Sequence, residues 1–186
     1  HNLHHWSKTN PHAKKQTKYQ HRFSCNVWLG IVGTTVIGPR FLNAVMNGAT
    51  YLEFLTNLLP DLLDNVPLAV RNNLIYQQDG APAHYSTAVR NWLDRHFNNR
   101  WIGRGGPTEW PPRSPDLTPL DFYAWGFMKD CVYSVEISSI EQLKQRIEEA
   151  GEKLQENLQS INLCEGIRRR YNLCVLKDGD HIENLL

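Results

Sequence analysis

Hydrophobic and polar residues alternate in the first patterned stretch of the chain, residues 22–32. Five apolar side chains recur there at every second position, the period of a β-strand with one buried face: Phe23, Cys25, Val27, Leu29 and Ile31. Gly33 and Thr34 predict a turn, and residues 35–42 predict a second strand that forms a hairpin with the first. Pro39 indicates a sheet edge or a strand end, because proline cannot donate a ladder hydrogen bond.

Helical periodicity begins at Thr50, which has the spacing of a capping box with Glu53. Pro60 is expected to kink or split the helix that follows, whose apolar stripe is Tyr51, Phe54, Leu55, Leu58, Leu59 and Leu62. A second helix is expected to open at Pro82, with an apolar face formed by Tyr85, Val89, Trp92, Leu93 and Phe97. Two short strands are predicted on either side of this second helix, over residues 73–78 and 100–103.

Prolines and glycines interrupt these patterns over residues 103–119. The five prolines and three glycines of that span cannot sustain a helix or a central strand, so it is predicted as a loop. The next helix is expected to have Thr118 as its N-cap and Asp121 in its first turn. Two more amphipathic helices follow, one after a capping box at Ser138–Glu141 and one over residues 161–174. This order of elements predicts an α/β protein, in which a hairpin joins a mixed sheet flanked by helices.

The composition is that of an ordinary globular chain. With 186 residues, 41% of them hydrophobic and 21% charged, it fits one domain and excludes wholesale disorder. No apolar run approaches the roughly 20 residues that span a bilayer, so no membrane partner is expected. The four cysteines are too sparse for a disulfide scaffold and predict reduced thiols in an intracellular protein. Because residue 1 is histidine, the chain is expected to be either processed or, by preference, a piece of a longer protein.

Charge is distributed unevenly along the chain. The formal net charge is only +1, yet residues 1–52 contain six lysines and arginines and no aspartate or glutamate. A basic stretch of this kind suits a polyanion such as nucleic acid, and it equally suits a solvated basic surface.

Two aspartates stand where an α/β fold gathers its ligands. Asp79 follows a predicted strand and precedes Gly80, at the edge where open α/β sheets bind ligands. Asp121 lies in the first turn of the helix behind the proline-rich loop. Paired carboxylates are hard oxygen ligands for Mg²⁺ or Mn²⁺, which can activate a water or a hydroxyl group for attack at phosphorus. Taken singly, Asp79 is also explained as a turn residue, Asp121 by the helix dipole, and Asp116 as a turn-stabilising side chain.

The residues around both aspartates form longer motifs. Residues 78–84 read Gln-Asp-Gly-Ala-Pro-Ala-His, and residues 110–122 read Trp-Pro-Pro-Arg-Ser-Pro-Asp-Leu-Thr-Pro-Leu-Asp-Phe. They resemble the two carboxyl-terminal motifs of the mariner superfamily of DDE transposases, and the resemblance covers nearly the whole chain. It implies an RNase H-like fold in which Asp79 and Asp121 are the second and third catalytic acids and bind Mg²⁺ or Mn²⁺. Asp116 then matches the internal aspartate, which is not a metal ligand.

The family's first catalytic aspartate lies on the strand before the hairpin, but this chain carries no acidic residue before Glu53. We therefore expect a partial RNase H-like catalytic domain over residues 1–135, with its first strand missing, and a helical carboxyl-terminal extension over residues 136–186. The parent protein would cut and rejoin DNA, whereas this chain alone is expected to be inactive. Two alternatives stay open: a catalytically dead nucleic-acid-binding relic or domesticated module, and an RNase H-like hydrolase without strand transfer.

The resemblance also implies the partners. These are transposon ends and target DNA in the nucleus, with no small-molecule substrate; the oligomeric state stays open, a homodimer being one form. Phosphate contacts are expected from Lys14, Lys15, Lys18, Arg100, Arg104, Arg113 and Lys129. His84 would orient Asp79, contact a phosphate or serve the helix start. Trp101 and Trp110 would either stack on unpaired DNA ends or anchor the core and the loop.

Overall fold

A β-hairpin lies at the centre of the fold. The computed structural model describes residues 23–42, 45–112, 114–180, 182 and 185. In it, β1 (Asn26–Val32) pairs with β2 (Thr35–Leu42) in antiparallel fashion, with a register shift between Trp28 and Gly30. The five alternating apolar side chains all pack into the same hydrophobic cluster. The predicted hairpin and its buried face are therefore confirmed.

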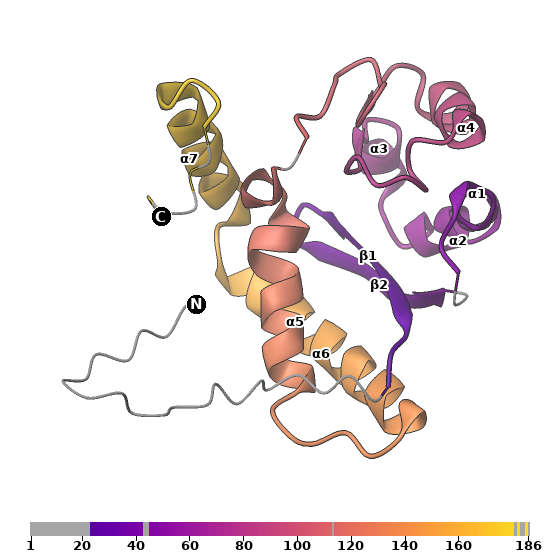
Figure 1. Cartoon of the computed structure of the whole chain (residues 1–186), viewed down its shortest axis with the longest axis vertical. Helices are drawn as coiled ribbons and strands as arrows, with labels where there is room; N and C mark the ends of the chain where they lie inside the picture. Colours follow the sequence, from indigo (N-terminus) through magenta and orange to yellow (C-terminus); the bar gives the residue numbers. More distant parts are fainter. Residues whose placement is uncertain (1–22, 43–44, 113, 181, 183–184, 186) are drawn as a thin grey trace, which may run out of the picture.

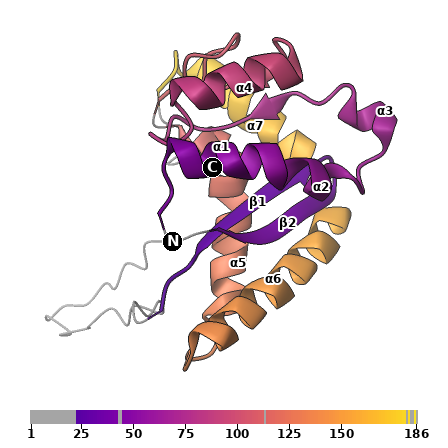
Figure 2. The same cartoon turned by 90° about the vertical axis from the view of Figure 1, so that its right-hand side faces the viewer.

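Different helices cover the two faces of the hairpin, as Figures 1 and 2 show together. They are α1 (Gly48–Asn57), α2 (Leu59–Leu63), α5 (Trp125–Val132) and α6 (Ile140–Ser160). α5 and α6 pack against the face that carries Leu29. On the other face, the Trp28 ring packs against Phe54 of α1, with 4.8 Å between the ring centroids. Because neighbouring residues of a strand point to opposite faces, β1 separates two hydrophobic clusters of the core.

The first helix begins three residues earlier than the sequence predicts. Asn47 is its N-cap, and the Asn47 side chain accepts the backbone N–H groups of Ala49 and Thr50 at 2.9 and 3.0 Å. The Thr50 hydroxyl accepts the N–H of Asn47 in return, so the capping box joins these two residues and the predicted pairing of Thr50 with Glu53 is wrong. The predicted split at Pro60 is confirmed, since α1 ends at Asn57 and Pro60 lies in the first turn of α2.

A second, smaller sheet lies beside the hairpin. β3 (Tyr76–Gln77) and β4 (Trp101–Ile102) run parallel. The N–H groups of Tyr76 and Gln78 donate to the carbonyls of Arg100 and Ile102, at 3.0 Å each. The short helix α3 (Leu68–Arg71), which the sequence did not predict, precedes β3. Within the described residues the two sheets share no strand, so the single mixed sheet expected from the sequence is replaced by two separate pairs.

The helix after Asp79 begins later than the sequence predicts. α4 (Thr87–Phe97) starts behind the N-cap Ser86, and not at Pro82. The buried residues of its predicted apolar face are Val89, Leu93 and Phe97. Tyr85, which was predicted to share that face, precedes the helix and is 38% exposed. That prediction is wrong because the turns over residues 82–85 do not continue the helical period.

Helices make up the carboxyl-terminal part of the chain, as predicted. α6 starts behind the N-cap Ser139, whose hydroxyl accepts the N–H of Gln142, one residue later than the predicted box at Ser138–Glu141. α7 (Leu163–Leu176) follows it. Across the described ranges, no helix is both long and apolar enough to cross a bilayer. The division of the chain at residue 135 stays a prediction.

A close contact between α6 and β2 tests this packing. A Cβ atom added to Gly151 of α6 would meet the Cδ of Pro39 at 2.6 Å, whereas one added to Gly126 of α5 would meet nothing within 4 Å. Gly151→Ala is expected to lower the free energy of unfolding by about 1–3 kcal/mol through overpacking. Gly126→Ala should raise it by roughly 0.5–1 kcal/mol, because alanine loses less backbone entropy in a helix. Equal effects of the two substitutions in urea unfolding would contradict the packing.

Candidate active site

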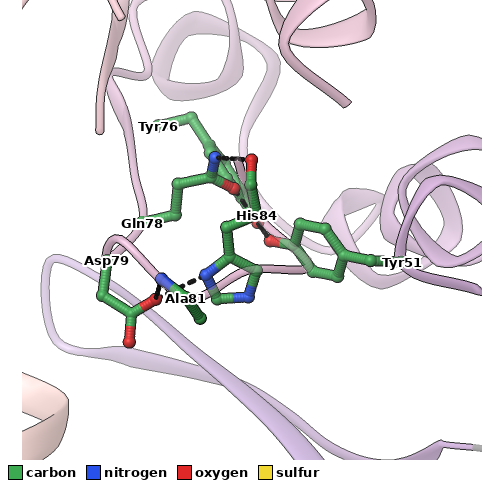
Figure 3. A network of polar contacts seen from close by, with 6 residues as sticks. All are labelled: Tyr51, Tyr76, Gln78, Asp79, Ala81 and His84. Atoms are coloured by element: carbon green, nitrogen blue, oxygen red, sulfur yellow. Dashed lines mark hydrogen bonds and ion pairs between the residues drawn. The ribbon is translucent and has the colours of Figure 1, made fainter. Parts of the chain in front are cut away.

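Asp79 follows β3 and is held by two donors. Its Oδ1 accepts the backbone N–H of Ala81 at 3.0 Å, and it lies 2.5 Å from the Nδ1 of His84. Figure 3 shows the Asp79 and His84 side chains pointing toward each other across the turn. The hydrogen bond from His84 lowers the pKa of Asp79, against the opposing effect of partial burial. Asp79 is therefore held as a carboxylate, with one oxygen engaged.

A buried polar network supports His84 from behind. Tyr51, only 2% exposed, places its hydroxyl 2.8 Å from the Tyr76 hydroxyl and donates to the Gln78 Oε1 at 3.2 Å. The Gln78 amide in turn donates to the His84 carbonyl at 3.1 Å, and the Tyr51 and His84 rings lie 4.4 Å apart (Figure 3). Burial raises the pKa of Tyr76 to about 12, so its hydroxyl stays protonated at neutral pH. Sequence reasoning missed this network, because Tyr51 matched the apolar stripe and Gln78 a strand end.

Asp121 lies in a widened helical turn. The loop over residues 103–119 contains a 3₁₀ turn, η1 (Pro115–Leu117), and leads into a π-helical turn, η2 (Leu120–Ala124), that continues as α5. The Thr118 carbonyl accepts the N–H of Asp121 at 2.9 Å. The N-cap of η2 is Pro119, and no side-chain hydrogen bond from the described residues caps this turn, so the predicted hydroxyl cap at Thr118 is wrong. A π-type turn is often found at functional sites, where it re-aims a side chain.

One groove brings Asp79 and Asp121 together. It has a volume of about 540 Å³ and runs along β1, the segment from Leu74 to Asp79, and the turn from Thr118 to Asp121. Burial raises the pKa of Asp121, and the negative charge of Asp79 raises it further, while Lys129 acts in the opposite direction. The two carboxylates, with 41 residues between them in the sequence, therefore influence each other through space.

The side chains of Asp79 and Asp121 are of a chemical type that binds divalent cations. Both aspartates offer carboxylate oxygens, and no hydrogen bond from the described residues engages the Oδ2 of Asp79. In the same part of the chain, no group of three or more histidine, cysteine, aspartate or glutamate side chains gathers at one point. Since Mg²⁺ takes about six oxygen ligands, these residues would supply two of them.

Asp116 points into the protein. Its Oδ2 accepts the backbone N–H of Ile182 at 3.0 Å, and its carbonyl accepts a hydrogen bond from the Arg170 guanidinium. The side chain is buried and joins the proline-rich loop to the segment after α7. This placement agrees with a loop-shaping part for Asp116, which is not among the residues that line the groove with Asp121.

Three of the seven basic residues expected to contact DNA lie in the described part of the chain. Lys14, Lys15, Lys18 and Arg113 lie outside the described residues. Arg100 donates to the carbonyls of Asn72 and Leu74 and so ties together the segments around β3 and β4. Lys129 is exposed on α5, and Arg104 is exposed beside Tyr85. Trp101 and Trp110 are 1% and 9% exposed, so both are anchors and the stacking alternative is wrong.

The sequence relatives of the chain are transposases. The Transposable element Tc1 transposase of Caenorhabditis elegans is 33% identical over 100 residues, which are 53% of this chain and 32% of the relative. The Tcb2 and Tcb1 transposases of Caenorhabditis briggsae are 26% and 29% identical, over 71% and 70% of this chain and 44% of each relative. The chain thus spans less than half the length of these relatives. No family model matches it.

A solved structure shares the fold of this chain. The crystal structure of the Mos1 mariner paired end complex with Mn matches 94% of this chain and 51% of its own, at a TM-score of 0.65 and 23% identity. This likeness shows a shared mixed α/β fold. Together with the sequence relatives, it confirms what the two acidic motifs indicate: the chain is related to part of a transposase of the mariner superfamily.

The electrostatic coupling of the two aspartates can be measured directly. Asp79→Asn removes one negative charge from the groove and is therefore expected to lower the pKa of Asp121 toward its ordinary value. Carbon-13 carboxyl NMR titration of Asp121 would measure the change. Asp130→Asn, which removes a charge from the exposed side of α5, is the matched control and should leave the Asp121 pKa in place. An unchanged pKa in the Asp79 variant would show that the carboxylates do not interact.

Proposed function

We propose that this chain is the carboxyl-terminal part of a DDE transposase catalytic domain, which in its complete form cuts and rejoins DNA with a divalent metal ion. The observation that carries the proposal is the coupling of Asp79 and Asp121 at one groove. Both lie in the motifs that match the superfamily. The Asp79 carboxylate accepts the N–H of Ala81, and the backbone N–H of Asp121 donates to the Thr118 carbonyl. The relatives by sequence support DNA transposition as the process.

Asp79 and Asp121 would hold Mg²⁺ or Mn²⁺ in this proposal. The Mos1 structure was solved with Mn, which agrees with carboxylate ligation of a divalent cation. Such an ion, when bound, supplies Lewis-acid activation of an attacking oxygen and stabilisation of the leaving oxygen at phosphorus. His84 keeps one Asp79 oxygen engaged, so the other remains directed to a ligand. Lys129 partly offsets the negative charge at Asp121 before any ligand arrives.

A third carboxylate would come from a strand that fills the groove. β1 and β3 each pair with one neighbour only among the described residues, and the groove follows both of them. A strand between them would satisfy two free edges and join the two small sheets into one RNase H-like mixed sheet. Residues 1–52 contain no acidic residue, so the required aspartate would lie on a segment that precedes this chain in the parent protein.

The partners follow from the same proposal. They are transposon ends and target DNA, reached in the nucleus, and the paired end complex of Mos1 supports DNA as the partner. The second candidate is a nucleic-acid-binding module without catalysis, which is favoured for this isolated chain because the described residues gather only two carboxylates at the groove. DNA cleavage by a protein that is extended at its amino terminus distinguishes the transposase from the binding module.

The experiment extends the chain at its amino terminus by the segment that carries the first aspartate. Nicking of a supercoiled plasmid in Mg²⁺ or Mn²⁺ should then appear, and Asp79→Asn or Asp121→Asn should abolish it. An amide keeps the shape of the side chain but loses the charge that balances the cation. Asp116→Asn is the matched control and should cost far less, because Asp116 contacts the backbone of Ile182.

Circular dichroism of every variant separates lost chemistry from lost folding. Full nicking by the Asp121→Asn variant would contradict the proposal. Loss of nicking by a folded Asp116→Asn variant, together with nicking by the Asp121→Asn variant, would contradict it as well.

A further inference from the structure

Tyr85 is exposed at a position where the helical pattern places a core residue, and two cations cover its ring. The guanidinium carbon of Arg90 lies 4.6 Å from the ring centroid, and that of Arg104 lies 4.2 Å from it. Tyr85 immediately precedes the N-cap of α4, Arg90 lies in the first turn of that helix, and Arg104 comes from the loop after β4. Three separate segments thus build one cationic cluster around an aromatic ring.

Tight backbone packing fixes the geometry of this cluster. Gly105 has a φ of +70°, and a Cβ atom there would meet the Tyr85 ring at 3.0 Å and the Arg90 guanidinium at 3.2 Å. A glycine is therefore needed both for the left-handed backbone and for the space. The loop backbone holds Tyr85 and Arg90 from one side, so the two side chains are ordered before any ligand arrives.

The positive charge of the cluster is not compensated by the described residues. Neither Arg90 nor Arg104 forms an ion pair with a described carboxylate, whereas Arg71 pairs with Asp64 at 2.8 Å. The Nε of Arg90 is buried and has no hydrogen-bond partner in that part of the chain. Two like charges held beside one ring repel each other, and an anion between them would relieve this repulsion.

The cluster adjoins the candidate active site. A Cβ atom added to Gly80, the residue after Asp79, would lie 3.6 Å from the Cδ of Arg104, so the Arg104 stem covers the backbone next to the carboxylate. Guanidinium groups match phosphate oxygens in geometry and charge, and their donors bind phosphate in a fork. Both guanidinium groups already pack on the Tyr85 ring, 4.6 and 4.2 Å from its centroid, which disfavours base stacking there and favours contact with the nucleic-acid backbone.

We propose that Tyr85, Arg90 and Arg104 form a clamp for the phosphodiester backbone of the DNA strand that passes Asp79. The clamp rests on the proposed function for the identity of its ligand. Tyr85 orients the two guanidiniums, and each guanidinium contacts a phosphate without reading a base. Arg90 and Tyr85 are thereby added to the DNA surface that the sequence indicates.

The test measures binding of the 186-residue chain to a fluorescent random-sequence duplex at several salt concentrations, in EDTA. Arg90→Gln and Arg104→Gln should each weaken binding and reduce the slope of log K against log salt by about 0.9, the value for one lost phosphate contact. Tyr85→Leu keeps both charges and should weaken binding by about two- to fivefold through loss of orientation. The control Arg95→Gln removes an exposed cation from the last turn of the same helix and should leave the slope unchanged.

Thermal melts confirm that each variant is folded. No binding by the unchanged chain at low salt, or equal slopes for the Arg90, Arg104 and Arg95 variants, would overturn the clamp. Because the binding experiment contains no metal ion, it is independent of cleavage. If the salt slopes fall as expected but the amino-terminally extended protein fails to nick DNA, the proposed function is contradicted and the clamp stays in place.

Discussion

Two negative charges in one groove repel each other, and the surroundings of Asp79 and Asp121 offset that repulsion unequally. Asp79 receives a backbone N–H and the His84 ring, which lower its pKa, while burial and the charge of Asp79 raise the pKa of Asp121. The first carboxylate is thus fixed and charged, and the second one carries the electrostatic cost of the pair. A cation placed between them would remove this cost, so the pair indicates a cation site, which neither residue alone does.

Two different local structures position these charges: a buried side-chain network for Asp79 and a π-helical turn for Asp121. Asp79 depends on a buried network that reaches from Tyr51 of α1 through Gln78 to His84. Asp121 depends on a π-helical turn anchored at the Thr118 carbonyl. The groove runs between them along β1 and β3. Each of these two strands has a strand partner on one edge only in the described ranges. Our proposal for the complete domain uses this groove as the place of one further strand.

Periodicity in the sequence predicted much of this architecture. The period of two in β1 and the apolar stripe of α6 depend on burial of one face, and one face is buried in both. Helix starts were less predictable, because the residue that takes an extended backbone becomes the cap: Asn47 does so and Thr50 does not. Similarly, the residue at the N-cap of η2 is Pro119 and not Thr118, and proline has no side-chain acceptor to cap the turn.

The candidate site could be predicted in part. The two acidic motifs identified Asp79 and Asp121, because short motifs of this kind are visible without any knowledge of three-dimensional contacts. The Tyr51, Tyr76 and Gln78 network and the cluster at Tyr85 join segments far apart in the sequence, and a helical period had placed Tyr85 in the core. The separation into two small sheets also depends on which edges meet in space, and local sequence patterns carry no such information.

The central claim is that Asp79 and Asp121 act together on one divalent ion. Titration of the isotope-labelled chain with Mn²⁺ tests it most directly, because the unpaired electrons of Mn²⁺ broaden the NMR signals of nearby amides. The account predicts that the amides of Gly80 and Phe122, which follow the two aspartates, broaden together at the same Mn²⁺ concentration, and that the amide of Ile182 beside Asp116 stays sharp. Broadening at only one of the two aspartates, or first at Ile182, would contradict it.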